Sequence, residues 1–385
     1  MATKSPSRRV PAEVRRAGVT MMGPFPPPLG GSAKITELIF ESLSAANVDV
    51  TKIDLSANNL AHRRNIAYHL QRLTRNVSGL LRSRQRAERG STLYIVPDGG
   101  HGAWYTLAHV RAAGGGYGKS VLHHHSCRYV ETHSRPVDML TRSYHEKATH
   151  VFLTAGMAED FQRRYRPVTH LIASNARFVA DEAGLDASPR LEGPVRLGHL
   201  GNLCRDKGFF AVADAYDALR ECAVDAVLRL AGPVLEPEVQ ARLDQLRSAH
   251  GQLVQHAGPV SGSAKRDFYR SIDCFLFPTQ WSQEAAPVVI YEALAAGVPV
   301  LSTDRGRIPE IVWGERGAVC PRDGSFTKLI VDYLRDSDWS VAAHGNRATS
   351  IKASVRTEGE RARADFAQLM TLLGADAGAD LGSAW

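Results

Sequence analysis

The chain has 385 residues, of which 44% are hydrophobic and 23% charged, and its formal net charge at pH 7 is +7. These values are typical of a soluble globular protein with room for two domains. No apolar run reaches the ~18 residues of a transmembrane helix, and five scattered cysteines without CxxC spacing indicate reduced thiols rather than a disulfide framework or a zinc site. The positive charge fits a phosphate-bearing ligand, nucleic acid or an anionic membrane surface, and does not choose between them.

The N-terminal half predicts a first α/β unit. Residues 1–17 are basic and lack an apolar segment, so they predict a flexible tail rather than a secretory signal. Apolar runs then alternate with helical segments, which indicates a parallel sheet covered on both faces. The predicted strands are residues 19–23, 48–55, 92–97, 120–125, 150–155 and 169–174, with helices that include 34–46 and 61–90.

The segment DASPRLEGP (186–194) predicts a linker, after which the alternation resumes. Strands are predicted at 195–201, 226–233, 253–260, 274–279 and 298–303, and helices at 208–222, 237–250, 263–272, 287–297 and 360–373. We therefore expect two doubly wound domains, 18–188 and 189–365, followed by a helix end and a disordered tail over 366–385. Ligands of such sheets bind outside the carboxyl ends of the strands, and two facing units form a cleft.

The most informative segment is QEAAPVVIYEALAAG (283–297). Glu284 ends a loop after an apolar run, and Glu292 lies eight positions later within a predicted helix. The start of that helix offers free N–H groups to a phosphate, and the carboxylates offer acceptors to sugar hydroxyls. Two solvated surface acids are the alternative, but the apolar residues 287–290 between them argue against it. The segment therefore favours a nucleotide-sugar enzyme.

Three segments together resemble the retaining family 4 glycosyltransferases of GT-B fold. They are the E-x7-E segment with EALAAGVPVLSTDRGRIPEIV (292–312), the basic loop GNLCRDKG (201–208) and the glycine loop PFPPPLGGSAKI (24–35). The likeness covers about residues 18–370 and is strongest over 195–321. It implies two Rossmann-like domains that face a cleft, with the acceptor in the first domain and the nucleotide-sugar donor in the second.

The resemblance also implies residue roles. Glu284 would bind donor-sugar hydroxyls, Glu292 the ribose hydroxyls, and Lys207 the diphosphate leaving group. The remaining implied contacts are backbone groups at Ala285, Ala286, Pro287 and Val288 toward the sugar and diphosphate, Gly30 and Gly31 toward the phosphates, and His125 toward the sugar near its reacting carbon. The chain departs from the family pattern at Asn202, where arginine is usual and Arg205 could supply the charge, and at Ala285 and Ala286, where glycines are usual.

Two further motifs invite other interpretations. Residues 123–125 are consecutive histidines, but neighbouring strand residues point to opposite faces, so only His123 and His125 could share an ion. We expect one of these histidines to contact the sugar, with a structural role as the alternative, and we expect no metal site. The segment AGGGYGKS (113–120) nearly matches a phosphate-binding P-loop, but it precedes a predicted strand instead of following one, so we expect a surface turn.

The predicted helix 61–90 carries eight arginines and one acid. Its apolar stripe, Ile66, Leu70, Leu73, Val77 and Leu80, could face the core, or it could lie on an anionic membrane. Nucleic acid is not expected, because no aromatic residues interleave the arginines.

An acceptor pocket is predicted after the third strand, at Asp98, His101 and Trp104, with a capped turn as the alternative.

The sequence thus predicts a retaining glycosyltransferase that moves a sugar from a nucleotide diphosphate to a saccharide or lipid-linked acceptor, in cell-surface glycan synthesis. No DxD motif follows a strand, so neither metal nor cofactor is expected. A GT-B epimerase or phosphorylase, or a non-catalytic sugar-nucleotide binding protein, is the alternative. We expect a cytoplasmic protein that can lie on the inner face of the membrane.

Overall fold

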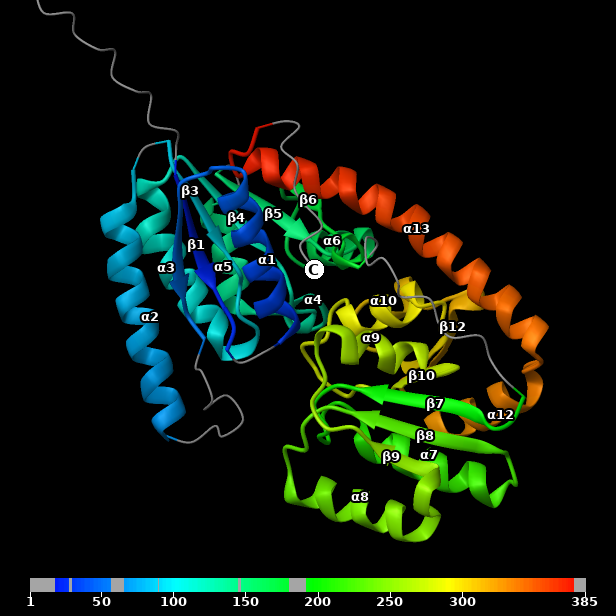
Figure 1. The fold of residues 1–385 in the computed structure, drawn as a ribbon. Helices are drawn as coiled ribbons and strands as arrows, with labels where there is room; N and C mark the ends of the chain where they lie inside the picture. Colours follow the sequence, from blue (N-terminus) through cyan, green and yellow to red (C-terminus); the bar gives the residue numbers. More distant parts are fainter. Residues whose placement is uncertain are drawn as a thin grey trace, which may run out of the picture.

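The computed structural model describes residues 18–27, 30–56, 66–88, 90–144, 147–179 and 192–376. Within them the chain forms two six-stranded sheets, each entirely parallel and flanked by helices (Figure 1). The predicted fold class, two Rossmann-like doubly wound units, is confirmed. The predicted tail, 1–17, and most of the predicted linker lie outside the described residues.

The first sheet has the order β2-β1-β3-β4-β5-β6. Its strands are β1 (Val19–Gly23), β2 (Val50–Asp54), β3 (Thr92–Ile95), β4 (Lys119–His123), β5 (Ala148–Phe152) and β6 (His170–Ile172). Its helices are α1 (Gly31–Ala45), α2 (Ile66–Arg86), α3 (Ala103–Ala113), α4 (Arg128–Glu131), α5 (Arg135–Tyr144) and α6 (Ala155–Arg164), with short 3₁₀ turns η2 (Gly100–Gly102), η3 (Gly114–Gly116) and η4 (Asn175–Phe178). The near P-loop segment falls on η3 and the start of β4, which is the turn that its context predicts.

The second sheet has the order β12-β11-β10-β7-β8-β9. Its strands are β7 (Val195–Leu200), β8 (Ala226–Ala231), β9 (Val254–His256), β10 (Cys274–Phe277), β11 (Val300–Thr303) and β12 (Gly317–Cys320). Its helices are α7 (Phe209–Glu221), α8 (Pro237–His250), α9 (Gly262–Arg270), α10 (Val288–Ala295), α11 (Ile308–Ile311), α12 (Phe326–Asp336) and α13 (Val341–Leu372), with η5 (Gly251–Leu253) and η6 (Gly314–Arg316).

Each sheet has a point where the strand order reverses. In the first sheet it lies between β1 and β3, and in the second between β7 and β10. Connections leave these neighbouring strands in opposite directions, so the loops at their carboxyl ends diverge and leave room for a ligand. The loops after β1, β3, β7 and β10 are the ones that hold most of the residues singled out in the sequence.

The long helix α13 connects the two domains. It begins within the second domain and runs along both (Figure 1), and its C-terminal part packs on β6 and η4 of the first domain. There the ring of Phe366 lies 5.3 Å from that of Phe178. The helix is longer than the predicted 360–373. The prediction missed its earlier turns because they bury only small or widely spaced apolar residues among charged ones.

The hypothesis that the apolar stripe of helix α2 faces the core is wrong. Its buried residues are Asn76, Gly79 and Ser83, which lie at helical spacing on one side. A Cβ at Gly79 would lie 2.8 Å from Leu55 Cδ2, so the small residue lets the helix approach the sheet closely. The apolar stripe points outward instead. The exposed fractions are 79% for Ile66, 57% for Leu70, 47% for Leu73 and 49% for Val77. The predicted Leu80 is half-buried instead, and its neighbour Leu81, 57% exposed, continues the outer stripe.

Candidate active site

Lys207 and Glu284 form an ion pair at the switch point of the second sheet. Lys207 lies in the loop after β7 and Glu284 in the loop after β10, and 2.5 Å separate Nζ from Oε2. Thr279 donates a second hydrogen bond to the same oxygen, at 3.2 Å. The side chains keep 25% and 12% of their surface exposed. The pair therefore stays within reach of a ligand while most of its surface is removed from water.

The loop that carries Lys207 is held against the loop after β10. Gly208 has a φ of +84°, and a Cβ there would lie 2.0 Å from the carbonyl oxygen of Pro278. Gln280 donates its backbone N–H to the carbonyl of Asp206 at 2.8 Å. Only glycine allows both this backbone conformation and this approach. The two loops are thus fixed relative to each other, and with them the lysine and the glutamate.

The loop from Glu284 to the start of α10 is tied down through its carbonyl groups. Arg307 donates its backbone N–H to Ala285, and Asn175 of the first domain donates its side-chain amide to Ala286, at 2.8 and 2.7 Å. The N–H groups of Ala285 and Ala286 have no acceptor among the described residues. Pro287 has no N–H, so the donors implied for the sugar and diphosphate reduce to residues 285, 286 and 288. Asn175 belongs to no motif, and Arg307 lies within the 292–312 segment but was given no role, so the sequence singled out neither residue.

Glu292 lies on α10 and is held by other partners. Its side chain is 3% exposed and pairs with the ammonium group of Lys265, and Tyr269 donates a hydrogen bond to its Oε2 at 3.0 Å. The expectation that both motif carboxylates are shielded from solvent is therefore confirmed. The structure does not bring Glu292 into contact with Glu284 or Lys207. Lys265 was missed in the sequence because nothing in SAKRDFYRSI distinguishes it from a surface lysine.

The remaining predicted donor-binding residues of the second domain lie apart from the ion pair. Arg205 is exposed, and its guanidinium group lies 4.5 Å from the centre of the Phe210 ring. Its backbone N–H donates to Glu236 Oε2 at 3.1 Å. Asn202 is half-buried. Neither Asn202 nor Arg205 contacts Glu284, so the described structure leaves Lys207 as the cation beside that carboxylate.

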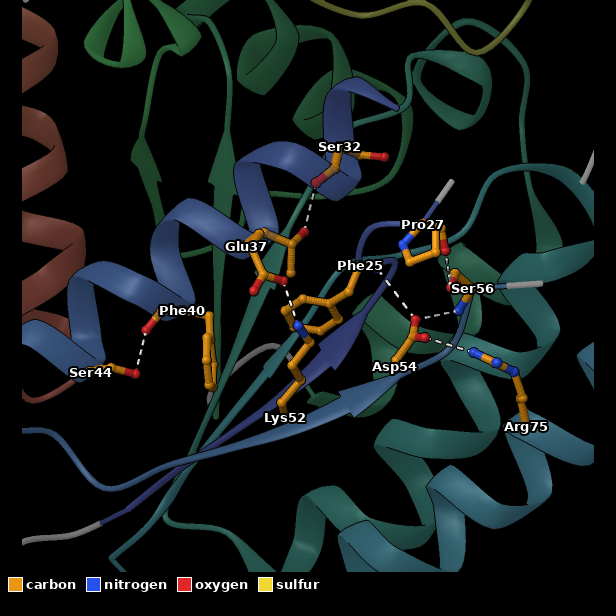
Figure 2. Close-up of polar contacts among 11 residues, drawn as sticks. Phe25, Pro27, Ser32, Glu37, Phe40, Ser44, Lys52, Asp54, Ser56 and Arg75 are labelled. Carbon is orange, nitrogen blue, oxygen red and sulfur yellow. Dashed lines mark hydrogen bonds and ion pairs between the residues drawn. The ribbon is translucent and has the colours of Figure 1, made fainter. Parts of the chain in front are cut away.

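In the first domain, Gly30 and Gly31 lie at the N-terminus of α1, after β1. Among the described residues, no side chain caps this helix and no atom lies within 4 Å of a Cβ built on either glycine. Asp54 holds the preceding segment, because its Oδ1 accepts the N–H groups of Phe25 and Ser56 at 3.4 and 2.8 Å (Figure 2). Gly30 and Gly31 thus lie at the switch point of the first sheet, with no described side chain packed on them.

The predicted acceptor residues follow β3 in the same region. Asp98 forms an ion pair of 2.6 Å with Arg72 of α2, while His101 and Trp104 are exposed. A Cβ at Gly99 would lie 2.6 Å from Gln283 Oε1, so this loop contacts the residue that precedes Glu284. The carboxyl ends of the two sheets therefore face each other.

The histidine run follows the same edge. The rings of His123 and His125 are 4.2 Å apart. The ring of His124, on the other side of the strand, stacks on Phe152 and lies 2.8 Å, from Nε2 to Nδ1, from His150. Burial lowers the pKa of His125 to about 4, so its imidazole is neutral at pH 7. Its Nε2 has no hydrogen-bond partner among the described residues. No group of three or more metal-ligating side chains occurs in the described parts of the chain.

Comparison with known proteins matches the second domain to a family. Residues 194–336 match the family model described as "Glycosyl transferases group 1". The chain is 28% identical over 251 residues to phosphatidyl-myo-inositol mannosyltransferase from Mycobacterium leprae, covering 57% of this chain and 63% of that one. It is 28% identical over 200 residues to the lipopolysaccharide core biosynthesis mannosyltransferase LpsB from Rhizobium meliloti, covering 49% and 54%. The match thus spans less than two thirds of the length of these relatives.

Solved structures resemble the whole chain. Sucrose-phosphate synthase from Thermosynechococcus elongatus superposes with a TM-score of 0.66 at 16% identity, over 93% of this chain and 99% of that one. HepE from Anabaena, in complex with UDP and glucose, superposes with a TM-score of 0.63 at 11% identity, over 92% and 100%. Residues 194–336 are therefore similar to a group 1 glycosyltransferase domain, and the chain as a whole has the two-domain GT-B fold.

Proposed function

We propose that this protein is a glycosyltransferase that moves a sugar from a nucleotide diphosphate to an acceptor held by the first domain. The observation that carries the proposal is the Lys207–Glu284 ion pair at the switch point of the second sheet. The match of residues 194–336 to group 1 glycosyltransferases supports it, as does the similar fold of HepE, whose structure contains UDP and glucose.

The pair has the chemistry that this reaction needs. As the bond to the sugar breaks, negative charge builds on the departing diphosphate, and fixed cations and N–H groups stabilise it. Lys207 would supply the charge, and the N–H groups of residues 285, 286 and 288 would donate hydrogen bonds. Glu284, once Lys207 turns to the diphosphate, would accept hydrogen bonds from sugar hydroxyls. The ion pair would thus exchange its internal contact for contacts to the two halves of the donor.

We propose further that transfer retains the anomeric configuration and needs no metal ion. In a front-face displacement the leaving diphosphate takes the proton of the acceptor hydroxyl, and Lys207 with the N–H groups compensates its charge. His125, neutral at pH 7, would contact the sugar from the first domain. Glu292 is proposed to meet the ribose hydroxyls, which requires its contact with Lys265 to loosen. Product NMR tests retention, and an inverted linkage would refute it. Full activity in excess EDTA tests metal independence.

The names of the related proteins suggest which classes of donor and acceptor this protein uses. Two are mannosyltransferases, one for phosphatidyl-myo-inositol and one for lipopolysaccharide core, and a third is described as a putative teichuronic acid biosynthesis glycosyltransferase. We therefore propose a hexosyl donor and a saccharide or lipid-linked acceptor in cell-surface glycan synthesis. Thermal-shift screening with UDP, GDP, ADP and TDP identifies the base, because a bound nucleotide raises Tm by mass action. If none of the four shifts Tm, the proposal of a nucleotide-diphosphate donor is contradicted.

A further inference from the structure

The outer face of α2 is apolar and basic, and nothing in the described structure covers it. Five large apolar side chains at helical spacing, Ile66, Leu70, Leu73, Val77 and Leu81, are each exposed by 47% or more. They account for five of the eight large hydrophobic side chains that are exposed in the described residues. Contiguous apolar surface of this kind marks an interaction site.

The charge of the helix narrows the choice of partner. Ile66–Arg86 contains five arginines and no acidic residue. Arg72 and Arg75 pair with Asp98 and Asp54 toward the domain, whereas the exposed Arg82, Arg84 and Arg86 have no acidic partner among the described residues. Two copies of this helix packed together would oppose like charges along their length. An anionic lipid surface satisfies both the apolar stripe and the arginines.

We propose that α2 lies in the interface of an anionic bilayer, with its apolar stripe among the acyl chains. The helix stands on the outer side of the first domain, away from the second, so no other element of the described structure obstructs that approach (Figure 1). No helix of the described residues is long and apolar enough to cross a bilayer. In the proposed arrangement, α2 lies in the interface of one leaflet. The buried small residues of α2 keep it fixed to its sheet while the opposite face meets the lipid.

The same helix contacts the predicted acceptor loop. Arg72 of α2 pairs with Asp98 at 2.6 Å, and a Cβ at Gly102 would lie 2.3 Å from the same guanidinium group. If the proposed function holds, docking of α2 places this loop near the lipid surface, where a lipid-linked acceptor would be found. Membrane docking itself does not depend on that function.

Flotation of the full chain with vesicles tests the proposal. We expect binding to phosphatidylcholine vesicles that contain phosphatidylglycerol at low ionic strength, and weaker binding to pure phosphatidylcholine. Val77→Gln should weaken binding severalfold, whereas Val341→Gln, at an equally exposed valine of the second domain (47% against 49%), should leave it unchanged. Leu73→Gln, Val77→Gln and Leu81→Gln combined should weaken it at least tenfold. Arg84→Gln and Arg86→Gln should each weaken binding to the anionic vesicles roughly fivefold.

Absence of flotation with anionic vesicles, or equal effects of Val77→Gln and Val341→Gln, would overturn the proposal. A concentration-dependent dimer in sedimentation that the triple variant abolishes would also overturn it, because the face would then bind a second copy. The test is separable from the transferase proposal. Vesicle binding needs no donor, and the triple variant should retain nucleotide binding and transfer to a soluble acceptor.

Discussion

Gly306 sets the shape of the loop that carries Glu284. Its φ is +54°, and a Cβ there would lie 2.2 Å from the carbonyl oxygen of Glu284. Gly314 has nearly the same φ, +56°, with no atom within 4 Å of its Cβ position. An alanine at either position would adopt the same unfavourable backbone conformation, but only at Gly306 would its Cβ also clash. Comparing the two substitutions therefore isolates the effect of the clash.

We predict that Gly306→Ala destabilises the protein more than Gly314→Ala. The left-handed conformation costs an alanine roughly 1–2 kcal/mol at either position. At Gly306 the clash adds about 1–3 kcal/mol and displaces the Glu284 loop. Urea unfolding measures the difference, and nucleotide affinity should fall only in Gly306→Ala. Equal losses of stability would mean that the contact does not constrain the loop.

For individual residues, the sequence identified the side chains that form the site better than it identified the residues they contact. Glu284 and Lys207 were singled out because their motifs are specific, and they lie together in the structure. The partners of Glu292 and the tether from Asn175 depend on chain segments 27 and 111 residues away. Contacts of that kind follow from the tertiary fold and leave no local pattern. The contact of Arg205 with Phe210 is local, but no motif indicated it.

Helix α13 joins the domains through apolar contacts at its C-terminal end. Phe366 is 2% exposed, and its ring lies near Phe178 and 5.6 Å from the guanidinium group of Arg177. Loss of this anchor would free the helix from the first domain while its first turns stayed on the second. The helix therefore limits how far the two domains separate.

We predict that Phe366→Ala lowers the free energy of unfolding by about 3–5 kcal/mol, the usual cost of truncating a buried phenylalanine. The unfolding transition should also become less cooperative, because the domains lose a shared element. Calorimetry measures both effects. Gln368→Ala, at an exposed position two residues further along the same helix, should change neither. A normal transition in Phe366→Ala would show that α13 does not couple the domains.

Element prediction succeeded where periodicity was strong and failed where it was not. The strand Val19–Gly23 and the helix Pro237–His250 match their predicted bounds. Helix α12 was missed although Phe326, Ile330 and Leu334 recur at four-residue spacing behind a Ser325 cap. The stripe on α2 was recognised, but periodicity cannot tell which face of a helix meets the core. In α2 the small residues Gly79 and Ser83 decide it, because they allow close packing.

Across the whole molecule, buried histidines make stability depend on pH. Burial lowers the pKa of His109 and His199 to about 4 and that of His150 to about 3, and it holds those of His123 and His124 well below 6.5. The unfolded chain binds protons on these groups near pH 6.5, and the folded chain does not until about pH 4. Stability therefore falls as pH drops through this window.

We predict a urea midpoint that is flat from pH 8 to about 7 and falls steeply between about pH 6.5 and 4.5. Each buried histidine contributes on the order of 1 kcal/mol per pH unit within the window. His109→Gln should reduce the slope, because it removes one of the titrating groups. Nε2 of His109 contacts Asn76 Oδ1, and glutamine can also form a hydrogen bond there. A midpoint independent of pH over this range would contradict the assignment of neutral buried imidazoles.

The most direct test is a comparison of wild type and Glu284→Gln with the nucleoside diphosphate chosen from UDP, GDP, ADP and TDP, measuring affinity by titration calorimetry and transfer by product formation. The substitution removes the carboxylate that neutralises Lys207. We predict nucleoside diphosphate affinity equal to or above that of wild type, together with a fall in kcat/KM of about 100-fold or more, equivalent to roughly 3 kcal/mol. Transfer at the wild-type rate, or loss of nucleotide affinity in a folded variant, would contradict the account.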